Sequence, residues 1–449
     1  MALPRGEFSS RFGFIMAAAG SAVGLGNIWG FPTQAASNGG AAFLLVYLVL
    51  AFSLAYPALM AELIIGRHAK SNIVTALSTL STNSRISVFG KATGFLGLAT
   101  VCVILSFYAI VAGWMLAFCL SYFLQLLGFS TTAQWLTNFG VLRNIVFLFI
   151  FMAMTVLVIC GGVKNGIERW SARFMPALFV ILLVLIAYVM TLEGALTGLK
   201  AYFIPDFNAA FKPALILSAL GQSFFSMSLG VGTMLIYGSY VKRSENIVAL
   251  GRFVTLIDIG VAVTAGMLII PAMYVAQLND IAIFDDGGEL LSEDTLIFSV
   301  LPALFNTMEV SGTLVAFVFF TLMSIAALTS SISMLEAPVA YAVERHNIKR
   351  INATLLIGAS VLALSTLIVF NFSSLFSLAV MVSTQYSQPL VGLVLCVFAG
   401  WVWQRNSMLK EIQAGFDGAE LSLFWKIWPH YVRYVCPAAI GAIFLNQFL

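Results

Sequence analysis

A glycine-rich interruption inside the first apolar segment restricts the possible folds more than any other feature. The stretch from Gly20 to Asn27 holds three glycines and an asparagine, and Pro32 follows soon after. Glycine disfavours a helix by about 1 kcal/mol relative to alanine, and an unpaired backbone group in lipid costs several kcal/mol. Such a break is tolerated at membrane depth only if an ion or a polar solute satisfies the freed backbone groups. We therefore interpret it as a binding site.

The composition is that of a protein embedded in a bilayer. Of 449 residues, 61% are hydrophobic and 9% are charged, whereas soluble chains carry about 25% charged residues. We expect one transmembrane domain over residues 1–449 and no separate soluble domain. The five cysteines fit neither metal nor redox spacing and are expected to be packed thiols. No nucleophile–base pair or phosphate loop occurs, so we expect neither an enzyme nor a nucleic-acid partner.

Eleven apolar runs are long enough to cross a bilayer. The last is the weakest, because Arg433 and Pro437 interrupt it. We expect an all-α polytopic membrane protein with eleven transmembrane helices, at about 12–36, 41–66, 92–126, 143–162, 170–191, 214–240, 250–277, 308–343, 351–371, 375–403 and 427–448.

Lysine and arginine indicate the orientation, since cytoplasmic loops carry an excess of both. With the N-terminus inside and the runs alternating, nineteen of these residues lie on the inner side and three on the outer side. We therefore expect a multi-pass protein of the cell membrane with a cytoplasmic N-terminus and an external C-terminus.

The sixth run is interrupted in the same way as the first. Its middle, Gly221 to Gly232, places glycines, serines and a glutamine at membrane depth. An offset of five makes the two broken runs cross the membrane in opposite directions. This pattern is typical of an inverted five-helix repeat whose broken helices meet at the midplane. We expect repeats over about 11–191 and 213–403 and an extra helix over about 427–448.

Polar groups within the runs are the candidates for chemistry. Three are carboxylates, and an intramembrane acid costs about 2.5–3.5 kcal/mol on insertion scales. Asp258 follows the second broken run, so we assign it to a cation site, whereas Glu62 and Glu336 are interpreted as structural anchors. Thr329 and Ser330 offer adjacent hydroxyls to a hard cation, although hydroxyls also serve as ordinary packing groups between membrane helices.

These segments resemble the neurotransmitter:sodium symporters. The stretch from Ala18 to Asn27, with Phe31-Pro32 after it, is similar to the first helix of that family. Gly221 to Gly230 is similar to the sixth helix and Leu328 to Ser333 to the eighth. The likeness covers nearly the whole chain, and eleven helices are typical of the shorter bacterial members, which transport amino acids. It implies the leucine transporter fold, with helices 1–5 and 6–10 as the inverted repeat and helices 1 and 6 broken.

The resemblance implies two sodium sites and a substrate site. Sodium site one would use Ala22, Asn27, Ser226 and Asp258, with the substrate carboxylate completing it. Sodium site two would use Gly20, Val23, Ala326, Thr329 and Ser330. The substrate would contact Ala22, Gly24, Leu25, Gly26, Ile104, Tyr108, Phe225, Ser226, Ser228, Val231, Ser330 and Met334.

Two positions bear on the substrate implied by the resemblance. Monoamine carriers have an aspartate at the position of Gly24, so glycine leaves room for a substrate that brings its own carboxylate. The first half-helix then offers its N–H groups and its dipole to that anion. Relatives often carry a bulkier residue at Val231, which favours a hydrophobic or aromatic L-amino acid.

Chloride-dependent relatives hold the anion with a tyrosine, a glutamine and two serines. Tyr47, Gln222 and Ser226 match, but Ala262 occupies the last position. Because Asp258 already supplies a fixed negative charge, we expect no requirement for chloride.

The gates match the family on one side only. The outer gate of the family pairs an arginine with an aspartate, but Gly30 occupies the arginine position and residues 345–410 contain no Asp or Glu. We therefore expect Tyr108 and Phe225 to close the outer side. The inner gate keeps the family's residues, with a phenylalanine for the usual tryptophan: Arg5, Glu344, Tyr240 and Phe8.

Together these features predict a sodium-coupled symporter that imports an amino acid by alternating access. The alternative is a non-transporting amino-acid sensor, or a channel-like protein, on the same fold. Apart from the amino acid and the lipid bilayer, the sequence predicts no partner and does not indicate an oligomeric state.

Overall fold

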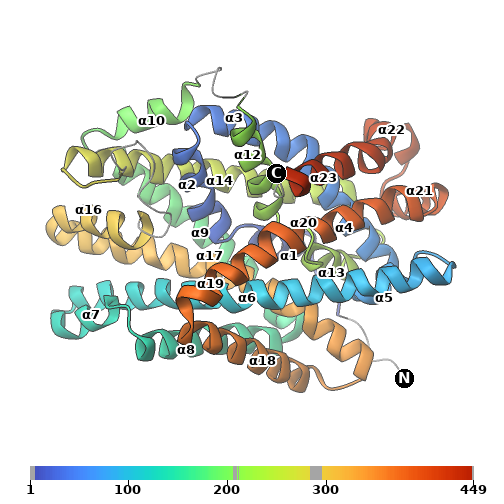
Figure 1. Ribbon diagram of the computed structural model, residues 1–449, viewed down its shortest axis with the longest axis horizontal. Coiled ribbons are helices and arrows are strands. Elements are labelled where there is room, and N and C mark those ends of the chain that lie inside the picture. Colours follow the sequence, from blue (N-terminus) through green and yellow to red (C-terminus); the bar gives the residue numbers. More distant parts are fainter. Residues whose placement is uncertain (1–5, 206–209, 211, 284–295, 447–449) are drawn as a thin grey trace.

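The computed structural model describes residues 6–446 except 206–209, 211 and 284–295, and this part of the chain contains helices and no strands. The helices run mostly along one long axis (Figure 1). Eight helical runs are long and apolar enough to cross a membrane, and a ninth is counted if one bent pair is a single span. The main helices of the eight are α3 and α4 (Ala41–Leu50, Tyr56–Ala69), α6 (Ser84–Leu126), α8 (Val141–Cys160), α9 (Arg169–Val189), α14 (Ile247–Leu278), α17 (Glu309–His346), α18 (Arg350–Phe370), and α19 with α20 (Phe372–Val380, Gln388–Val397).

The bent pair is the predicted first broken helix. Helix α1 (Arg11–Ala22) ends at Val23, whose backbone is extended, and the chain resumes as the helical run Gly26–Ser37, which ends in α2 (Phe31–Ser37). The two parts meet at 55°. The break predicted from the glycines is therefore confirmed.

The second predicted break is also present. Helix α12 (Pro213–Ser226) stops, and six residues separate it from the start of α13 (Thr233–Ser239). Between them the backbone of Gly230 and Gly232 has φ of 76° and 78°, a left-handed conformation that glycine adopts without strain. The glycines in this stretch therefore end one helix and allow the next to start.

The remaining predicted spans consist of shorter helices. Residues 214–240 hold α12 and α13, and residues 427–448 hold the second half of α22 (Leu423–His430) and then α23 (Cys436–Asn446). The total of eleven crossings and the boundaries of the two repeats therefore stay predictions.

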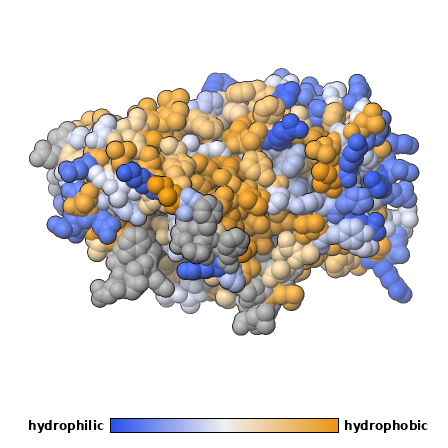
Figure 2. All heavy atoms as spheres, turned by 90° about the horizontal axis from the view of Figure 1, so that it is seen from above, coloured by the Kyte–Doolittle hydropathy of each residue, from blue (hydrophilic) through white to orange (hydrophobic). Residues whose placement is uncertain are grey.

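The broken helices lie inside a shell of long helices. Helix α1 packs against α9, α14 and α17, while α13 packs against α4. The outside of the shell is apolar: Leu157, Val184 and Leu356 are 72%, 58% and 60% exposed. Figure 2 shows a broad hydrophobic band across the middle of the molecule. A continuous exposed apolar surface of this kind fits a lipid environment.

Hydrophilic residues gather at one end of the molecule, on the right in Figure 2, where α5 (Ile73–Thr79) and α21 (Arg405–Gln413) lie in Figure 1. At this end Arg67 of α4 is fully buried and its Nε lies 2.8 Å from Oε1 of Glu411 in α21. Arg67 also donates a hydrogen bond of 2.7 Å to the carbonyl of Glu245. The pair therefore connects three segments that are distant in the sequence.

The ion pair between Arg67 and Glu411 contributes a stability that depends on pH. Burial alone would raise the pKa of the Glu411 carboxyl, but the hydrogen bond with His68 and the charge of Arg67 outweigh it and hold the pKa below its usual value. A lowered pKa in the folded state contributes stability above the unfolded pKa of about 4.3, and this is lost as the pH falls through the lowered value.

Replacing Arg67 by methionine tests this connection. The substitution leaves the Glu411 carboxylate buried without its main partner, so we expect the free energy of unfolding to fall by about 3–5 kcal/mol. Thermal unfolding of the purified protein in detergent measures the change. The control is Glu420→Gln, which alters an exposed acid at the same end and is expected to leave the midpoint unchanged. Equal midpoints for the two variants would contradict the assigned role of the pair.

Candidate functional site

The first predicted cation site is a buried cluster around Asp258. Nδ2 of Asn27 donates to Oδ1 of Asp258 at 2.7 Å and to Oγ of Ser226 at 3.0 Å. The Ser226 hydroxyl donates to Oδ2 of Asp258 at 2.9 Å, and the Tyr47 hydroxyl lies 3.4 Å from Ser226 Oγ. Each of these side chains is at most 1% exposed. These hydrogen bonds join three elements: the break in the first helix, the end of α12 and the middle of α14.

The chemistry of this cluster fits a hard monovalent cation. Among the described residues, no lysine, arginine or histidine forms an ion pair with Asp258. A buried carboxylate without a paired charge is costly. The Ser226 and Tyr47 hydroxyl oxygens lie beside it. Asn27 turns its amide nitrogen to Asp258, and its Oδ1 accepts the N–H of Gly24 at 3.2 Å, so this oxygen would face the carboxylate after rotation of the amide. Oxygen donors of this kind are those that a hard ion prefers. Ala22, the predicted carbonyl ligand, lines the adjoining cavity.

The second predicted cation site is a convergence of carbonyl groups on α17. Oγ of Ser330 lies 3.3 Å from the carbonyl oxygen of Gly20 and 3.2 Å from that of Val23. The Thr329 hydroxyl donates to the carbonyl of Ala326 at 3.0 Å. A hydroxyl has one proton and can satisfy one carbonyl at a time. The carbonyls of Gly20, Ser21 and Val23 therefore surround one hydroxyl that can satisfy only one of them, and the remaining lone pairs are available to a cation.

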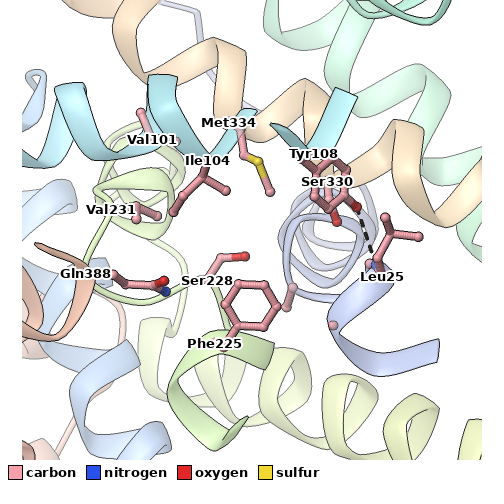
Figure 3. A pocket seen from close by; sticks show the side chains of 13 residues that line it. Leu25, Val101, Ile104, Tyr108, Phe225, Ser228, Val231, Ser330, Met334 and Gln388 are labelled. Carbon is pink, nitrogen blue, oxygen red and sulfur yellow. Dashed lines mark hydrogen bonds between the residues drawn. The ribbon is translucent and has the colours of Figure 1, made fainter. Parts of the chain in front are cut away.

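A small cavity of about 30 Å³ adjoins the second cluster, since Ser330 lines it, and Gly26 and Phe225, the chain neighbours of Asn27 and Ser226, line it too. Figure 3 shows Leu25 and Tyr108 on one side of it and Val231 and Gln388 on the other. Eleven of the twelve predicted substrate residues line it: Ala22, Gly24, Leu25, Gly26, Ile104, Tyr108, Phe225, Ser228, Val231, Ser330 and Met334. The twelfth, Ser226, faces the Asp258 cluster instead.

Two residues that line the cavity were missed by the sequence reasoning. Val101 precedes Ile104 by three residues on α6, so helical periodicity alone places both on one face. Gln388 is a glutamine within the apolar run 375–403, directly before Pro389. Its polarity at membrane depth was the signal that could have identified it.

Glycine is required where the first helix approaches the cavity. A Cβ atom at Gly24 would lie 2.3 Å from Oγ of Ser330 and 3.0 Å from the Tyr108 hydroxyl. The neighbouring backbone N–H of Leu25 donates to the Tyr108 hydroxyl at 3.4 Å, as the dashed line in Figure 3 marks. The absence of a side chain therefore lets the backbone contact both α6 and α17.

The boundary of the cavity on its predicted outer side is uncharged. Phe225 and Gln388 line both this cavity and a larger one of about 460 Å³, which is also lined by Gly30, Gln34 and Gln385. The predicted outer gate residues Tyr108 and Phe225 thus both reach the cavity.

On the predicted inner side, Phe8 is 4% exposed and packs edge-on against the rings of Phe14, Tyr237 and Tyr240. The predicted gate residue Glu344 accepts hydrogen bonds of 2.9 Å and 2.7 Å from the backbone and side chain of Asn72. Its predicted partner Arg5 lies outside the described residues.

The two other membrane carboxylates bind backbone or charged groups. Oε1 of Glu62 accepts the N–H of Gly230, in the break between α12 and α13, at 2.7 Å. Glu336 accepts the Tyr240 hydroxyl at 2.6 Å and forms an ion pair with Arg350. These contacts support their interpretation as structural anchors.

The close approach at Gly24 gives a matched pair of substitutions. Gly24→Ala overfills the contact with Ser330 and Tyr108, and we expect it to lower the free energy of unfolding by about 1–3 kcal/mol. A Cβ at Gly221 meets nothing within 4 Å, so Gly221→Ala should be neutral or stabilise α12 by up to about 1 kcal/mol. Thermal unfolding measures both. If the two substitutions changed the free energy of unfolding equally, the close contact of Gly24 with Ser330 and Tyr108 would not matter for stability.

Comparison with known proteins identifies the family. The Sodium:neurotransmitter symporter family matches residues 5–138 and 122–449. The chain is 33% identical to the uncharacterized sodium-dependent transporter YhdH of Bacillus subtilis (strain 168) over 460 aligned residues, covering 98% of this chain and 97% of that protein. It is 24% identical to the sodium- and chloride-dependent taurine transporter of Bos taurus, covering 76% of this chain and 61% of that protein.

A solved structure is similar over the whole chain. The crystal structure of MhsT in complex with L-phenylalanine matches with a TM-score of 0.85 and 34% identity, covering 99% of this chain and 100% of that one. This match confirms the predicted leucine transporter fold. These relatives are multi-pass transporters and not enzymes. The chain belongs to the sodium:neurotransmitter symporter family.

Proposed function

We propose that the protein imports a hydrophobic or aromatic L-amino acid together with sodium by alternating access. The observation that carries this proposal is the buried, unpaired carboxylate of Asp258 beside the break in the first helix. Asn27 belongs to this cluster, and Leu25 and Gly26, directly before it in the chain, line the cavity. An amino acid and a cation would therefore bind side by side. MhsT, the 34% identical structure, is in complex with L-phenylalanine, an aromatic amino acid.

Coupling follows from this adjacency. The substrate carboxylate would be held by the N–H groups of the first half-helix and would complete the oxygen shell of sodium site one. Each ligand would then raise the affinity for the other by the same factor. The carbonyls of Gly20, Val23 and Ala326 and the hydroxyls of Thr329 and Ser330 would form sodium site two.

Alternating access requires that only one side of the cavity is open at a time. The outer side would be closed by Tyr108 and Phe225, and the inner side by the packing of Phe8 on Tyr240 with the help of Arg5 and Glu344. With the N-terminus in the cytoplasm of the cell, inward movement of one cation gains about 2.3 kcal/mol per 100 mV of membrane potential.

Chloride would not be required. The Asp258 carboxylate lies within hydrogen-bond distance of Ser226, one of the matching chloride residues. Gln222, another of them, donates to the carbonyl of Gly26 at 2.7 Å. Ala262 offers no hydroxyl. A fixed negative charge in this position would repel a second anion.

Uptake into proteoliposomes under an imposed inward sodium gradient tests the proposed transport. We expect accumulation of a radiolabelled aromatic or branched amino acid above its external concentration, and loss of accumulation when potassium replaces sodium on both sides. Sodium-dependent binding without uptake would instead identify a sensor, and uptake that never exceeds equilibrium would identify a channel-like protein.

Substitution of Asp258 by asparagine tests the role of the carboxylate. A full charge about 4 Å from a cation contributes roughly 4 kcal/mol at an effective dielectric constant of 20. We therefore expect the sodium concentration for half-maximal binding to rise at least tenfold, and any remaining uptake to require chloride. Wild-type uptake should be unchanged when gluconate replaces chloride. The control Asp417→Asn removes one exposed acid and should change neither property; a wild-type protein that stops in gluconate would overturn the chloride assignment.

A further inference from the structure

Gln388 presents an unpaired hydrogen-bond acceptor to the substrate cavity. The residue begins α20 and is 3% exposed. Figure 3 shows its amide group turned toward the cavity, on the side opposite Leu25 and Tyr108. Its Nε2 donates to the carbonyl of Leu229 at 2.8 Å, but its Oε1 is buried and has no hydrogen-bond partner among the described residues.

The orientation of this amide is fixed by its neighbour. Leu229 lies in the break between α12 and α13, and its carbonyl can only accept a hydrogen bond. The amide nitrogen of Gln388 must therefore face Leu229, because the opposite orientation would place two acceptors against each other. As a result, the oxygen is the atom left without a partner.

The backbone before Gln388 is shaped to bring this side chain to the cavity. Residues Met381–Ser387 form a π-helical segment, and the N–H of Gln388 bonds the carbonyl of Ser383, five residues earlier. The wider turn rotates all following side chains relative to a regular α-helix, and such segments are frequent at functional sites. Pro389 follows and has no N–H of its own.

An unpaired buried acceptor is unfavourable unless a ligand provides the donor. Leaving such a group unsatisfied costs about 1–3 kcal/mol. Val101, Ile104 and Val231 line the same part of the cavity and carry no donor. If the α-carboxylate binds near Leu25 and Gly26, as proposed above, the substrate side chain points toward Gln388.

We propose that Gln388 is a specificity-determining residue whose amide oxygen accepts a hydrogen bond from the side chain of the transported amino acid. This inference rests on the proposed function and narrows its substrate class to aromatic amino acids that carry a neutral donor, a phenol or an indole. A cationic side chain is excluded, because the thirteen residues lining the cavity include no carboxylate to offset the cost of burying its charge.

Matched ligands test this proposal on the full-length protein. Equilibrium binding in the presence of sodium is measured for L-tyrosine against L-phenylalanine, and for L-tryptophan against 1-methyl-L-tryptophan, which lacks the indole donor. We expect the donor-bearing member of at least one pair to bind about tenfold more tightly than the other. In Gln388→Met the acceptor is lost, and this preference should fall by about tenfold.

A second glutamine of the same segment provides the control. Gln385 lines the larger outer cavity and not the substrate cavity, so Gln385→Met should leave both ratios unchanged. Ratios in Gln388→Met equal to those of the wild type would overturn the proposal. If Gln388→Met does not fold, the binding ratios of the wild-type protein test the proposal. Equal or weaker binding of the donor-bearing ligand in both pairs would overturn the proposal.

The outcomes also separate this inference from the proposed function. Sodium-dependent binding of phenylalanine with no preference in either pair overturns the role of Gln388 alone. If no amino acid binds in the presence of sodium, the proposed function fails, and this inference fails with it.

Discussion

The structure depends on how backbone groups are satisfied where two helices stop inside the bilayer. Lipid offers no hydrogen bonds, so each freed N–H and C=O must find a partner within the protein or in a ligand. In the break between α12 and α13, Glu62 takes the N–H of Gly230 and Gln388 takes the carbonyl of Leu229. The carbonyls at the end of α1 converge instead on Ser330. Polar side chains of the surrounding helices therefore serve both breaks.

The hydrogen-bond partners at the two breaks fall into two groups with different consequences for the cavity. Groups that are satisfied by the protein itself fix the ends of the half-helices in place. Oxygen atoms around Asp258 and Ser330 keep unused lone pairs. These atoms lie in the interior of the protein, where a ligand can bind them. Preorganised donors and acceptors of this kind reduce the ordering that binding would otherwise require.

Much of this arrangement could be predicted from the sequence, because it depends on residue types with strong local effects. Glycines at 24, 230 and 232 mark the breaks, and a carboxylate at 258 within an apolar run marks a buried polar site. Gln388 was missed because its role depends on a π-helical turn, which the pattern of apolar residues does not reveal. Ser226 was assigned to the substrate as well as to the cation, although its hydroxyl faces only the Asp258 cluster. Side-chain direction at the end of a helix is set by tertiary contacts.

The wall between the two cavities has a consequence for the environments in which the protein can work. It includes an aromatic ring at Phe225 and an amide at Gln388, and the arginine position of a charged gate is Gly30. Attraction between ions weakens as electrolyte is added, since the Debye length falls from about 10 Å at 0.1 M to about 3 Å at 1 M. Contacts between uncharged groups lack this sensitivity. If this wall forms the outward gate, as proposed, its closure would depend little on whether the surroundings are dilute or saline.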